Sequence, residues 1–310
     1  MSAPRFEKLA VIGLGLLGGS VALAARERGL ALRVAGAGRR RPPLEDALAR
    51  GLVDEIGSVE EAVSGADLVV VATPVGAMPA TLQAAAAHLT PGAIVTDVGS
   101  VKGPLADSLP GILPPGVEYV GAHPMAGSHE KGNAHARADL FRGACCVVTP
   151  IPSTNAEALA RVRGFWEALG ARVIERSPGV HDDEVAWVSH VPHVLAFAFA
   201  HALGQAPAQV GEMAGSGFRD FTRIANSDAE LWGEILSSNT KALIGPIEAF
   251  KGALGELAHV IEHGDAEAQE RFLSSAREAL AAAAAHASNA GERSTPDDRD
   301  RNEDVPNGPG

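Results

Sequence analysis

Short apolar runs alternate with longer stretches of helical periodicity along the first part of the chain. The runs cover residues 9–13, 32–38, 68–74, 93–99, 119–124, 146–151 and 171–176. Nearly continuous apolar strands separated by helix-length segments are typical of a parallel sheet that is covered on both faces. We therefore predict an α/β fold over residues 1–177, built on a Rossmann-type, doubly wound parallel sheet.

The pattern changes after the segment "SPGVHDDEV". From residue 178 to residue 287, apolar positions recur with helical spacing and strand signals are few, so we predict a second, all-helical domain. Stretches such as "LIGPIEAFKGALGELAHVI" are apolar on more than one face, which favours a homodimer through these helices. Residues 288–310 are charged and rich in Pro, Gly and Asn, and they predict a disordered tail.

Composition excludes several classes of partner. The formal net charge of −12 argues against nucleic acid, because binding phosphates requires clustered Lys and Arg. The N-terminus carries no leader pattern and no window reaches the apolar length of a membrane span, so we expect a cytoplasmic protein without a membrane partner. The adjacent Cys145 and Cys146 are expected to be buried thiols, and no metal site is expected.

The first candidate motif is "VIGLGLLGGS", which follows the first predicted strand and opens a helix. Gly13 permits a tight turn, Gly15 lets the backbone approach a pyrophosphate, and Gly18 permits close packing of helix on strand. Leu16 and Leu17 begin the helix, whose N-terminus attracts an anion. The motif predicts a dinucleotide site, and the alternative is a plain glycine-rich turn.

The end of the second predicted strand bears on which dinucleotide binds. An acidic residue normally stands about 20 positions beyond the motif and holds the ribose of NAD. Here Gly38 stands there, followed by Arg39, Arg40 and Arg41. Guanidinium groups suit a 2′-phosphate, so we predict NADP with NAD as the alternative cofactor. A solvated basic loop remains open as the other interpretation.

Polar residues also follow the next strands. Thr73 and Pro74 end one strand, Ser100 and Lys102 follow another, and His123 ends a third within "GAHPMAGSHEKG". Residues at the carboxyl ends of parallel strands line the ligand crevice of such a sheet. An imidazole there can take or give a proton near neutral pH while a nicotinamide takes a hydride. The alternative is a histidine that only caps a loop.

Five segments carry a resemblance to a known family. "GLGLLGGS", "TDVGSVK", "GAHPMAGS", "SHVPH" and "GFRDFTRIANSDAELW" occur in an order and spacing similar to those of the prephenate/arogenate dehydrogenases of tyrosine biosynthesis. The resemblance implies NAD(P)-dependent oxidative decarboxylation of prephenate, arogenate or both. It also implies a homodimer, and Lys102 and Arg223 could supply positive potential for an anionic substrate.

The resemblance further implies roles for individual residues. His123 becomes the catalytic histidine on the C4 hydroxyl of the substrate, and Ser100 orients it beside the cofactor. Ser189 and His193 share a helix face at the active site, while Arg223 binds a substrate carboxylate. His129 stands where some members carry Glu, although Glu130 is adjacent, so either residue can gate the pocket.

Two other functions remain open at this point. A β-hydroxyacid dehydrogenase has a similar two-domain plan, but its catalytic lysine has no evident counterpart in "GEMAGSGFRDFTRIAN". A non-catalytic NADP-binding sensor that only dimerises through its helical half would leave His123, Ser100, His193 and Arg223 unexplained. Turnover of prephenate separates that sensor from an enzyme.

Overall fold

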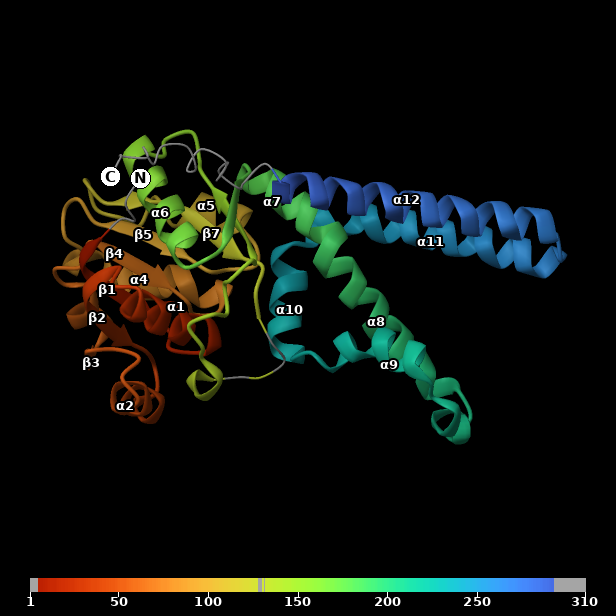
Figure 1. Ribbon diagram of the computed structural model, residues 1–310, viewed down its shortest axis with the longest axis horizontal. Helices are drawn as coiled ribbons and strands as arrows, with labels where there is room; N and C mark the ends of the chain where they lie inside the picture. Colours follow the sequence, from red (N-terminus) through yellow and green to blue (C-terminus); the bar gives the residue numbers. More distant parts are fainter. Residues whose placement is uncertain (1–4, 128–129, 131, 293–310) are drawn as a thin grey trace, which may run out of the picture. The chain divides into compact units, whose positions relative to one another are not determined.

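The first half of the chain folds around a parallel sheet. A computed structural model describes residues 5–127, 130 and 132–292 (Figure 1). Six parallel strands pair in the order β3-β2-β1-β4-β5-β6. They are β1 (Phe6–Ile12), β2 (Ala31–Ala37), β3 (Glu55–Gly57), β4 (Leu68–Val71), β5 (Ile94–Asp97) and β6 (Glu118–Tyr119). The predicted Rossmann-type α/β fold is confirmed.

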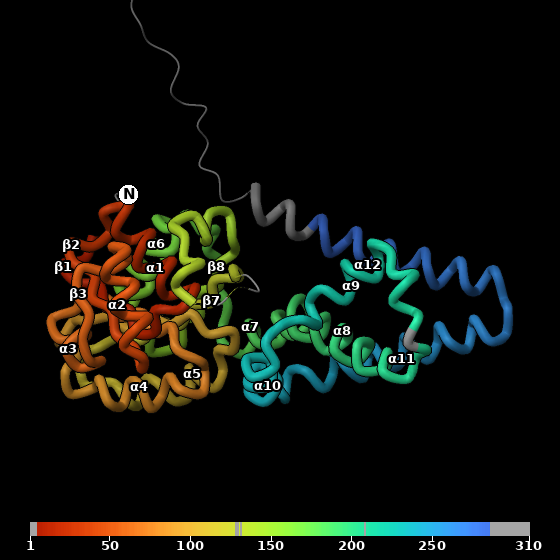
Figure 2. The backbone as a smooth tube through the Cα atoms, turned by 90° about the horizontal axis from the view of Figure 1, so that it is seen from below, coloured from red at the N-terminus to blue at the C-terminus, as the bar shows by residue number. Residues whose placement is uncertain are grey.

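Alternation along each strand divides the core into two layers. In β1, Leu9 and Val11 point into one hydrophobic cluster, whereas Ala10 and Ile12 point into the other. The first cluster is closed by α1 (Leu16–Glu27), α2 (Arg41–Ala49) and α6 (Ala156–Ala168). The second is closed by α3 (Val59–Val63), α4 (Met78–Ala85) and α5 (Gly103–Ser108). Figure 2 shows α1 and α6 on one side of the sheet and α3, α4 and α5 on the other.

The later strands depart from the expected single sheet. The run predicted over residues 119–124 divides into β6 and β7 (Gly121–Pro124). Strand β7 pairs antiparallel with β8 (Cys145–Thr149), which pairs parallel with β9 (Arg172–Glu175) in a separate three-stranded sheet. The prediction of one parallel sheet was therefore wrong for these strands, and it also missed the short β3. Both cysteines of β8 are free thiols, and Cys146 is buried as expected, whereas Cys145 is only partly buried.

Helices follow from Pro178 onward. They are α7 (Pro178–Val185), the π turn η4 (Ala186–His190), α8 (Val191–Ala202), α9 (Ser216–Thr222), α10 (Ala229–Ser238), α11 (Thr240–His263) and α12 (Ala266–Glu292). Short 3₁₀ turns are η1 (Val75–Ala77), η2 (Ala86–His88), η3 (Asn133–His135), η5 (Leu203–Gln205), η6 (Ala208–Met213) and η7 (Arg223–Asn226). Pro192 has no N–H to donate to the preceding turn, and the helix widens into the π turn just before it.

The chain packs as two compact units, residues 1–248 and 249–310. The helices from α7 to α10 belong to the first unit, so compactness divides the chain inside α11 rather than at residue 177. In the second unit, Gly264 has a φ of +66° and ends α11, and Asp265 caps α12. Helix α12 continues through residue 292, five residues beyond the predicted start of the tail, and residues 293–310 lie outside the described part of the chain.

One continuous helical segment, Pro178–Gln205, is long and apolar enough by length and composition to cross a membrane. Its first half, however, carries the buried polar residues His181, Asp182 and His190. Two of these side chains are hydrogen-bonded to residues of the nucleotide-binding half. We therefore interpret this segment as a helix of the fold that forms part of the site described next.

Candidate active site

The glycine motif forms a turn that only small residues permit. Gly13 has a φ of +99°, and a Cβ there would lie 2.6 Å from the carbonyl oxygen of Ala72. A Cβ on Gly18 would collide with the carbonyl of Gly13, so α1 packs directly against the strand ends as predicted. Gly15 is the N-cap of α1, has open space around it and provides no side-chain cap. The first turn of α1 thus fits a pyrophosphate, although binding by Leu16 and Leu17 remains a prediction.

A cavity of about 250 Å³ follows the end of β2. Its lining is formed by Gly38, Arg39, Arg41, Leu44, Ile56, Gly57, Ser58 and Glu61. Arg40 was predicted to bind the cofactor here, but it is the N-cap of α2 and is not among the lining residues. The one carboxylate of the lining, that of Glu61, accepts a hydrogen bond from the backbone N–H of Ser58 at 2.8 Å. Two guanidinium groups therefore dominate a pocket of the size and place expected for the ribose end of a dinucleotide.

Polar groups also lie just beyond the end of β4. Within the described residues, the buried hydroxyl of Thr73 has no hydrogen-bond partner. A buried hydroxyl without a partner is costly, and a bound ligand can satisfy it. Beyond Pro74, the backbone N–H of Gly76 donates to the carboxylate of Glu234 on α10. The segment that follows β4 is therefore joined to helix α10 by a direct hydrogen bond.

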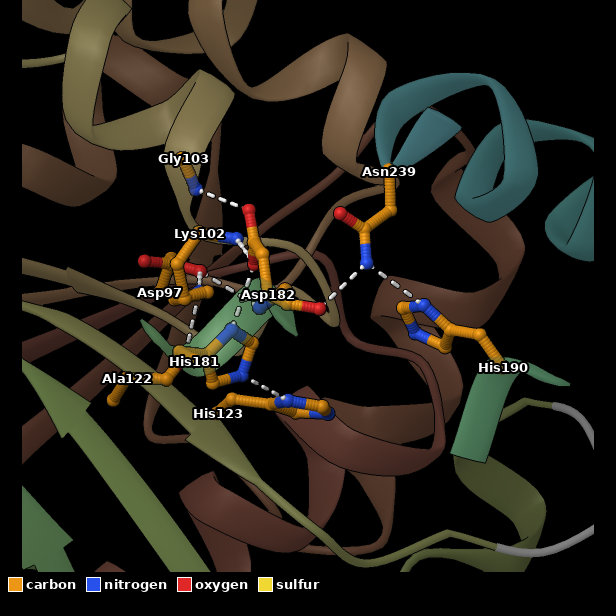
Figure 3. A network of polar contacts seen from close by, with 10 residues as sticks. Asp97, Lys102, Gly103, Ala122, His123, His181, Asp182, His190 and Asn239 are labelled. Carbon is orange, nitrogen blue, oxygen red and sulfur yellow. Dashed lines mark hydrogen bonds and ion pairs between the residues drawn. The ribbon is translucent and has the colours of Figure 1, made fainter. Parts of the chain in front are cut away.

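A chain of hydrogen bonds lies beside β7 (Figure 3). His123 Nδ1 lies 2.8 Å from Nε2 of His181, and Nδ1 of His181 lies 2.8 Å from the carboxylate of Asp182. The two oxygens of Asp182 also accept the backbone N–H groups of Lys102 and Gly103, each at 2.8 Å. Figure 3 shows the second ring nitrogen of His123 pointing away from His181. Burial, followed by the neighbouring His181 and Lys102, holds the pKa of His123 well below its usual value.

Lys102, which was expected to supply positive potential, is buried in the fold, and that role stays a prediction. Its side chain is fully buried, pairs with the carboxylate of Asp97 and donates to the carbonyl oxygen of Ala122 at 2.7 Å. The Tyr119 hydroxyl donates to the other oxygen of Asp97 at 2.8 Å. Burial lowers the pKa of Lys102, whereas the charge of Asp97 opposes that shift. The ammonium group thus fastens β7 to the loop after β5, directly beside His123.

The same loop reaches a second histidine on α8. Val101 packs against Trp232, and the Trp232 ring stacks on His193 with centroids 3.8 Å apart. His193 Nδ1 donates to the carbonyl oxygen of Ser189 at 2.8 Å, which leaves Nε2 as the acceptor nitrogen. Partial burial and the nearby charge of Arg223 lower the pKa of His193, whereas the bond to Ser189 raises it. The predicted pairing of Ser189 and His193 along one helix is present, with exposed Arg223 close to the ring.

Other predicted residues are not brought into this arrangement. Ser100 is partly exposed in the loop after β5, and among the described contacts no hydrogen bond joins it to His123. An orienting role for Ser100 in the substrate complex stays a prediction. His129 lies outside the described residues, and Glu130 forms an ion pair with His135 at 3.1 Å. In the described ranges, no group of three or more potential ligands is placed to hold a metal ion.

Sequence reasoning missed His181, Asp182, His190 and Asn239. Asn239 Nδ2 donates to the main-chain oxygen of Asp182 at 3.0 Å and to Nδ1 of His190 at 3.1 Å. Burial lowers the pKa of His190 to about 4. The available signal was the string "HDD" at the start of the helical half, where an imidazole directly precedes carboxylates. It was read only as a domain boundary.

Comparison with known proteins decides the family. Residues 21–175 match the nucleotide-binding domain of prephenate dehydrogenase, and residues 177–275 match the prephenate dehydrogenase dimerization domain. The chain belongs to the prephenate dehydrogenase family. The prephenate dehydrogenase of Bacillus subtilis is 31% identical over 281 residues, which are 88% of this chain and 75% of that protein.

Solved structures of the prephenate dehydrogenase family agree with the fold. Prephenate dehydrogenase from Aquifex aeolicus, in complex with hydroxyphenyl propionate and NAD+, superposes with a TM-score of 0.82 at 30% identity. That match covers 90% of this chain and 98% of the Aquifex chain. Arogenate dehydrogenase from Synechocystis has a TM-score of 0.77 at 32% identity, covering 88% and 98% of the two chains. Membership of this dehydrogenase family excludes the β-hydroxyacid dehydrogenase reading and makes the chain an NAD(P)-dependent oxidoreductase.

Proposed function

We propose that this enzyme oxidises and decarboxylates prephenate, arogenate or both, in the step that forms the aromatic ring of tyrosine. The observation that carries the proposal is the buried hydrogen-bonded series Asp182–His181–His123, in which the described contacts leave the second ring nitrogen of His123 unbonded and pointing away from His181 (Figure 3). A base in that place suits removal of the C4 hydroxyl proton of a cyclohexadienol. The same position in a sensor that only binds NADP would need no such base.

His123 first takes the C4 hydroxyl proton on Nε2, while the hydrogen on C4 leaves as hydride. Bound NADP+ supplies the hydride acceptor. The bond from C1 to its carboxylate then breaks, carbon dioxide leaves, and the bonding electrons make the ring aromatic. The phenolate oxygen formed in this way recovers its proton from His123. The histidine therefore has to hold a proton transiently, which suits a ring whose neutral form burial favours.

Two groups from the helices complete the substrate site. Arg223 is exposed and close to His193, so its guanidinium can bind a substrate carboxylate with two parallel hydrogen bonds. Nε2 of His193 is the nitrogen left to accept a hydrogen bond, and Trp232 fixes the plane of that ring. Ser189 supplies its carbonyl oxygen to the ring, and we propose that its hydroxyl faces the substrate.

We further propose NADP as the preferred cofactor. Arg39 and Arg41 line the pocket beside Gly38, and charge-assisted hydrogen bonds from guanidinium groups favour a 2′-phosphate over a hydroxyl. Arg41 also pairs with Glu45 at 2.9 Å, so Arg39 is the residue expected to contribute most. The Aquifex prephenate dehydrogenase was solved in complex with NAD+, so NAD is kept as the alternative cofactor.

We also infer a cytoplasmic homodimer. Large apolar side chains stay exposed along α11 and α12 within the single chain, among them Leu254, Ile261, Leu273 and Leu280. These helices lie largely in the part that matches the dimerization domain of the family. Sedimentation equilibrium of the purified chain tests the dimer.

Steady-state kinetics tests the proposed reaction. The purified enzyme is given prephenate or arogenate with NADP+ or NAD+, while reduced nicotinamide and the aromatic product are both measured. We expect one mole of 4-hydroxyphenylpyruvate or tyrosine per mole of reduced cofactor. Absence of turnover with all four pairs would contradict the proposal and favour the sensor.

A further inference from the structure

We propose that His181 and Asp182 are positioning residues that fix the tautomer of His123, so that Nε2 carries no hydrogen and is ready to accept one. The proposal rests on the proposed function only for the identity of the proton that His123 takes. His181 and Asp182 stand on α7, whereas His123 stands on β7, so the geometry depends on how the helices pack on the sheet.

The direction of each hydrogen bond in this series follows from the two backbone donors at the Asp182 end. The backbone N–H groups of Lys102 and Gly103 can only donate, so Asp182 accepts from both with its two oxygens. The same carboxylate then accepts from Nδ1 of His181, which places the hydrogen of that ring on Nδ1. Nε2 of His181 is left with a lone pair.

That lone pair fixes the second ring. Nε2 of His181 lies 2.8 Å from Nδ1 of His123, and with a neutral His181 that donates from Nδ1 this contact is a hydrogen bond only if His123 carries its hydrogen on Nδ1. Nε2 of His123 is then unprotonated and points away from His181 (Figure 3). The opposite tautomer would place two lone pairs against each other in a buried site, which costs free energy.

The exposed surface of the two rings indicates that His123, rather than His181, is the histidine that meets the substrate. His123 keeps 8% of its surface exposed, whereas His181 keeps 2%. When Nε2 of His123 takes a proton, Nδ1–H of His123 keeps its bond to His181, and the carboxylate of Asp182 lies on the far side of that ring. Since the intervening ring separates Asp182 from the substrate pocket, the carboxylate supports the resulting positive charge with less repulsion of an anionic substrate than direct contact would bring.

Asp182 also fastens the two parts of the site together. Its carboxylate accepts two backbone N–H groups from the loop and helix start after β5, and its carbonyl oxygen accepts from Asn239, the residue that follows α10. Removing Asp182 would therefore disturb packing as well as the tautomer. For this reason the test uses His181, whose side chain is hydrogen-bonded to His123 and Asp182 alone among the described contacts.

Two substitutions separate an acceptor from a space-filling group. His181→Leu keeps an apolar side chain of moderate size but offers no acceptor to Nδ1 of His123. His181→Gln keeps a carbonyl oxygen that can reach the place of Nε2. We expect His181→Leu to lower kcat by about 10²-fold or more, because a histidine base in the wrong tautomer loses most of its activity, while KM and the Kd of NADP+ change by less than about twofold. We expect His181→Gln to recover at least about tenfold of the lost kcat.

Tyr119→Phe is the matched control for loss of a buried hydrogen bond. It removes the hydroxyl that donates to Asp97 but leaves both histidines in contact. We expect a lower Tm and a kcat within about threefold of the wild-type value, as for a change in stability alone. A fall in kcat as large as that of His181→Leu would show that any buried defect in this region stops the enzyme, and would overturn the proposal.

A measurement without turnover makes the test independent of the substrate. Nitrogen-15 spectra of the full-length enzyme labelled at histidine report which ring nitrogen carries hydrogen, and His123→Asn assigns the signals of His123. We expect hydrogen on Nδ1 of His123 in the wild type and a mixture of tautomers in His181→Leu. Hydrogen on Nε2 in the wild type, or equal kcat values for the Leu and wild-type enzymes, would overturn the proposal. If neither prephenate nor arogenate turns over, the proposed function fails, yet the spectra still decide the role of His181; if His181→Leu does not fold, the wild-type and Gln spectra decide it.

Discussion

The cofactor side of the site and its catalytic side are built from different materials. On the cofactor side, the site is formed mainly by the backbone. Three glycines within six residues form the turn that leads into α1 and the first turn of that helix, and the helix N-terminus has no side-chain cap. On the catalytic side, the site is formed by buried side chains, whose hydrogen bonds join the loop after β5, strand β7 and helix α7. A backbone site fails when a Cβ is added, whereas a side-chain site fails when one partner is removed.

The difference has a consequence for stability. An uncapped helix start on the cofactor side is partly open to water, so the protein tolerates it before any ligand binds. The catalytic side holds Asp97 and Lys102 with no exposed surface, where charges persist only because each is paired. Substitutions on the catalytic side should therefore change activity and stability by more than those on the cofactor side.

His123→Asn should have the largest effect, since it removes the base and leaves the cofactor turn intact. Asn can still hydrogen-bond to His181, so we expect a folded protein. We expect kcat to fall by roughly 10²- to 10⁴-fold, with little change in the Kd of NADP+. Steady-state kinetics and a fluorescence titration of the cofactor measure both, and a kcat near the wild-type value would refute the assignment of the base.

Lys102→Met should cause the largest loss of unfolding free energy among these variants. It leaves the carboxylate of Asp97 buried with only the Tyr119 hydroxyl and the backbone N–H of Gly99 as partners. Breaking a buried ion pair in this way costs about 3–5 kcal/mol of unfolding free energy. Urea denaturation measures it, and Arg163→Met, in an exposed pair with Glu167, is the control with an expected cost below about 1 kcal/mol. Equal costs for the two variants would contradict the structural role of Lys102.

These two residues also show how far the sequence alone reaches. His123 could be found because it follows an apolar run and stands among glycines, both of which are local signals. The sequence places Lys102 on the same edge of the sheet, but whether it turns toward the crevice or into the core depends on Asp97 and Ala122, which are fixed only by folding. The direction in which Lys102 points is therefore decided by folding, whereas the catalytic role of His123 stays a prediction.

The same distinction between local sequence signals and contacts made only on folding applies to the strands. Strands with long apolar runs, such as β1 and β4, were predicted because both faces of a parallel sheet are buried. Nothing local in "YVGAHP" shows that the chain leaves the first sheet after Tyr119 and pairs antiparallel with β8 instead. His181 and Asp182 were missed for the same reason, because their partners lie about 60 to 80 residues earlier in the chain.

Acid should lower the stability of the folded protein through its buried histidines. The pKa of His190 is lowered from 6.5 to about 4, so it stays neutral in the folded protein while the unfolded chain takes a proton below pH 6.5. The unfolded state then binds more protons, and stability falls as pH falls from 6.5 toward about 4, by roughly 3 kcal/mol for this group. The lowered pKa of His123 adds a loss of the same sign.

Urea denaturation at a series of pH values between 4 and 7 measures this loss. His190→Gln keeps a polar group toward Asn239 but cannot titrate, so its stability should depend less steeply on pH than that of the wild type. Parallel curves for the two proteins would show that His190 is not the group responsible.

Arg223→Gln should weaken binding of the substrate and leave the glycine turn of the cofactor site unchanged. A charge-assisted bidentate contact is lost from both the ground state and the transition state, so KM for prephenate should rise by about 10- to 100-fold with a smaller change in kcat. Arg219→Gln is the control, because Arg219 donates to the carbonyl oxygen of Ala214 and is not expected to reach the substrate. An unchanged KM in Arg223→Gln would mean that another residue holds the carboxylate.

The smallest effect is expected on the cofactor side, where Arg39 stands beside Gly38 in the ribose pocket. Charged hydrogen bonds contribute roughly 1.5–3 kcal/mol, so NADP+ should be favoured over NAD+ by about tenfold or more in kcat/KM. A Cβ on Gly38 would meet only Leu44 Cδ2 at 3.4 Å, an ordinary contact, so Gly38→Asp should fold normally. Combined with Arg39→Ser, it should repel the phosphate, bind the ribose hydroxyl and reverse the preference. Kinetics with both cofactors decides this: if the wild-type enzyme uses NAD+ at least as well as NADP+, then Arg39 and Arg41 are only a solvated loop, and the backbone turn alone defines the cofactor side.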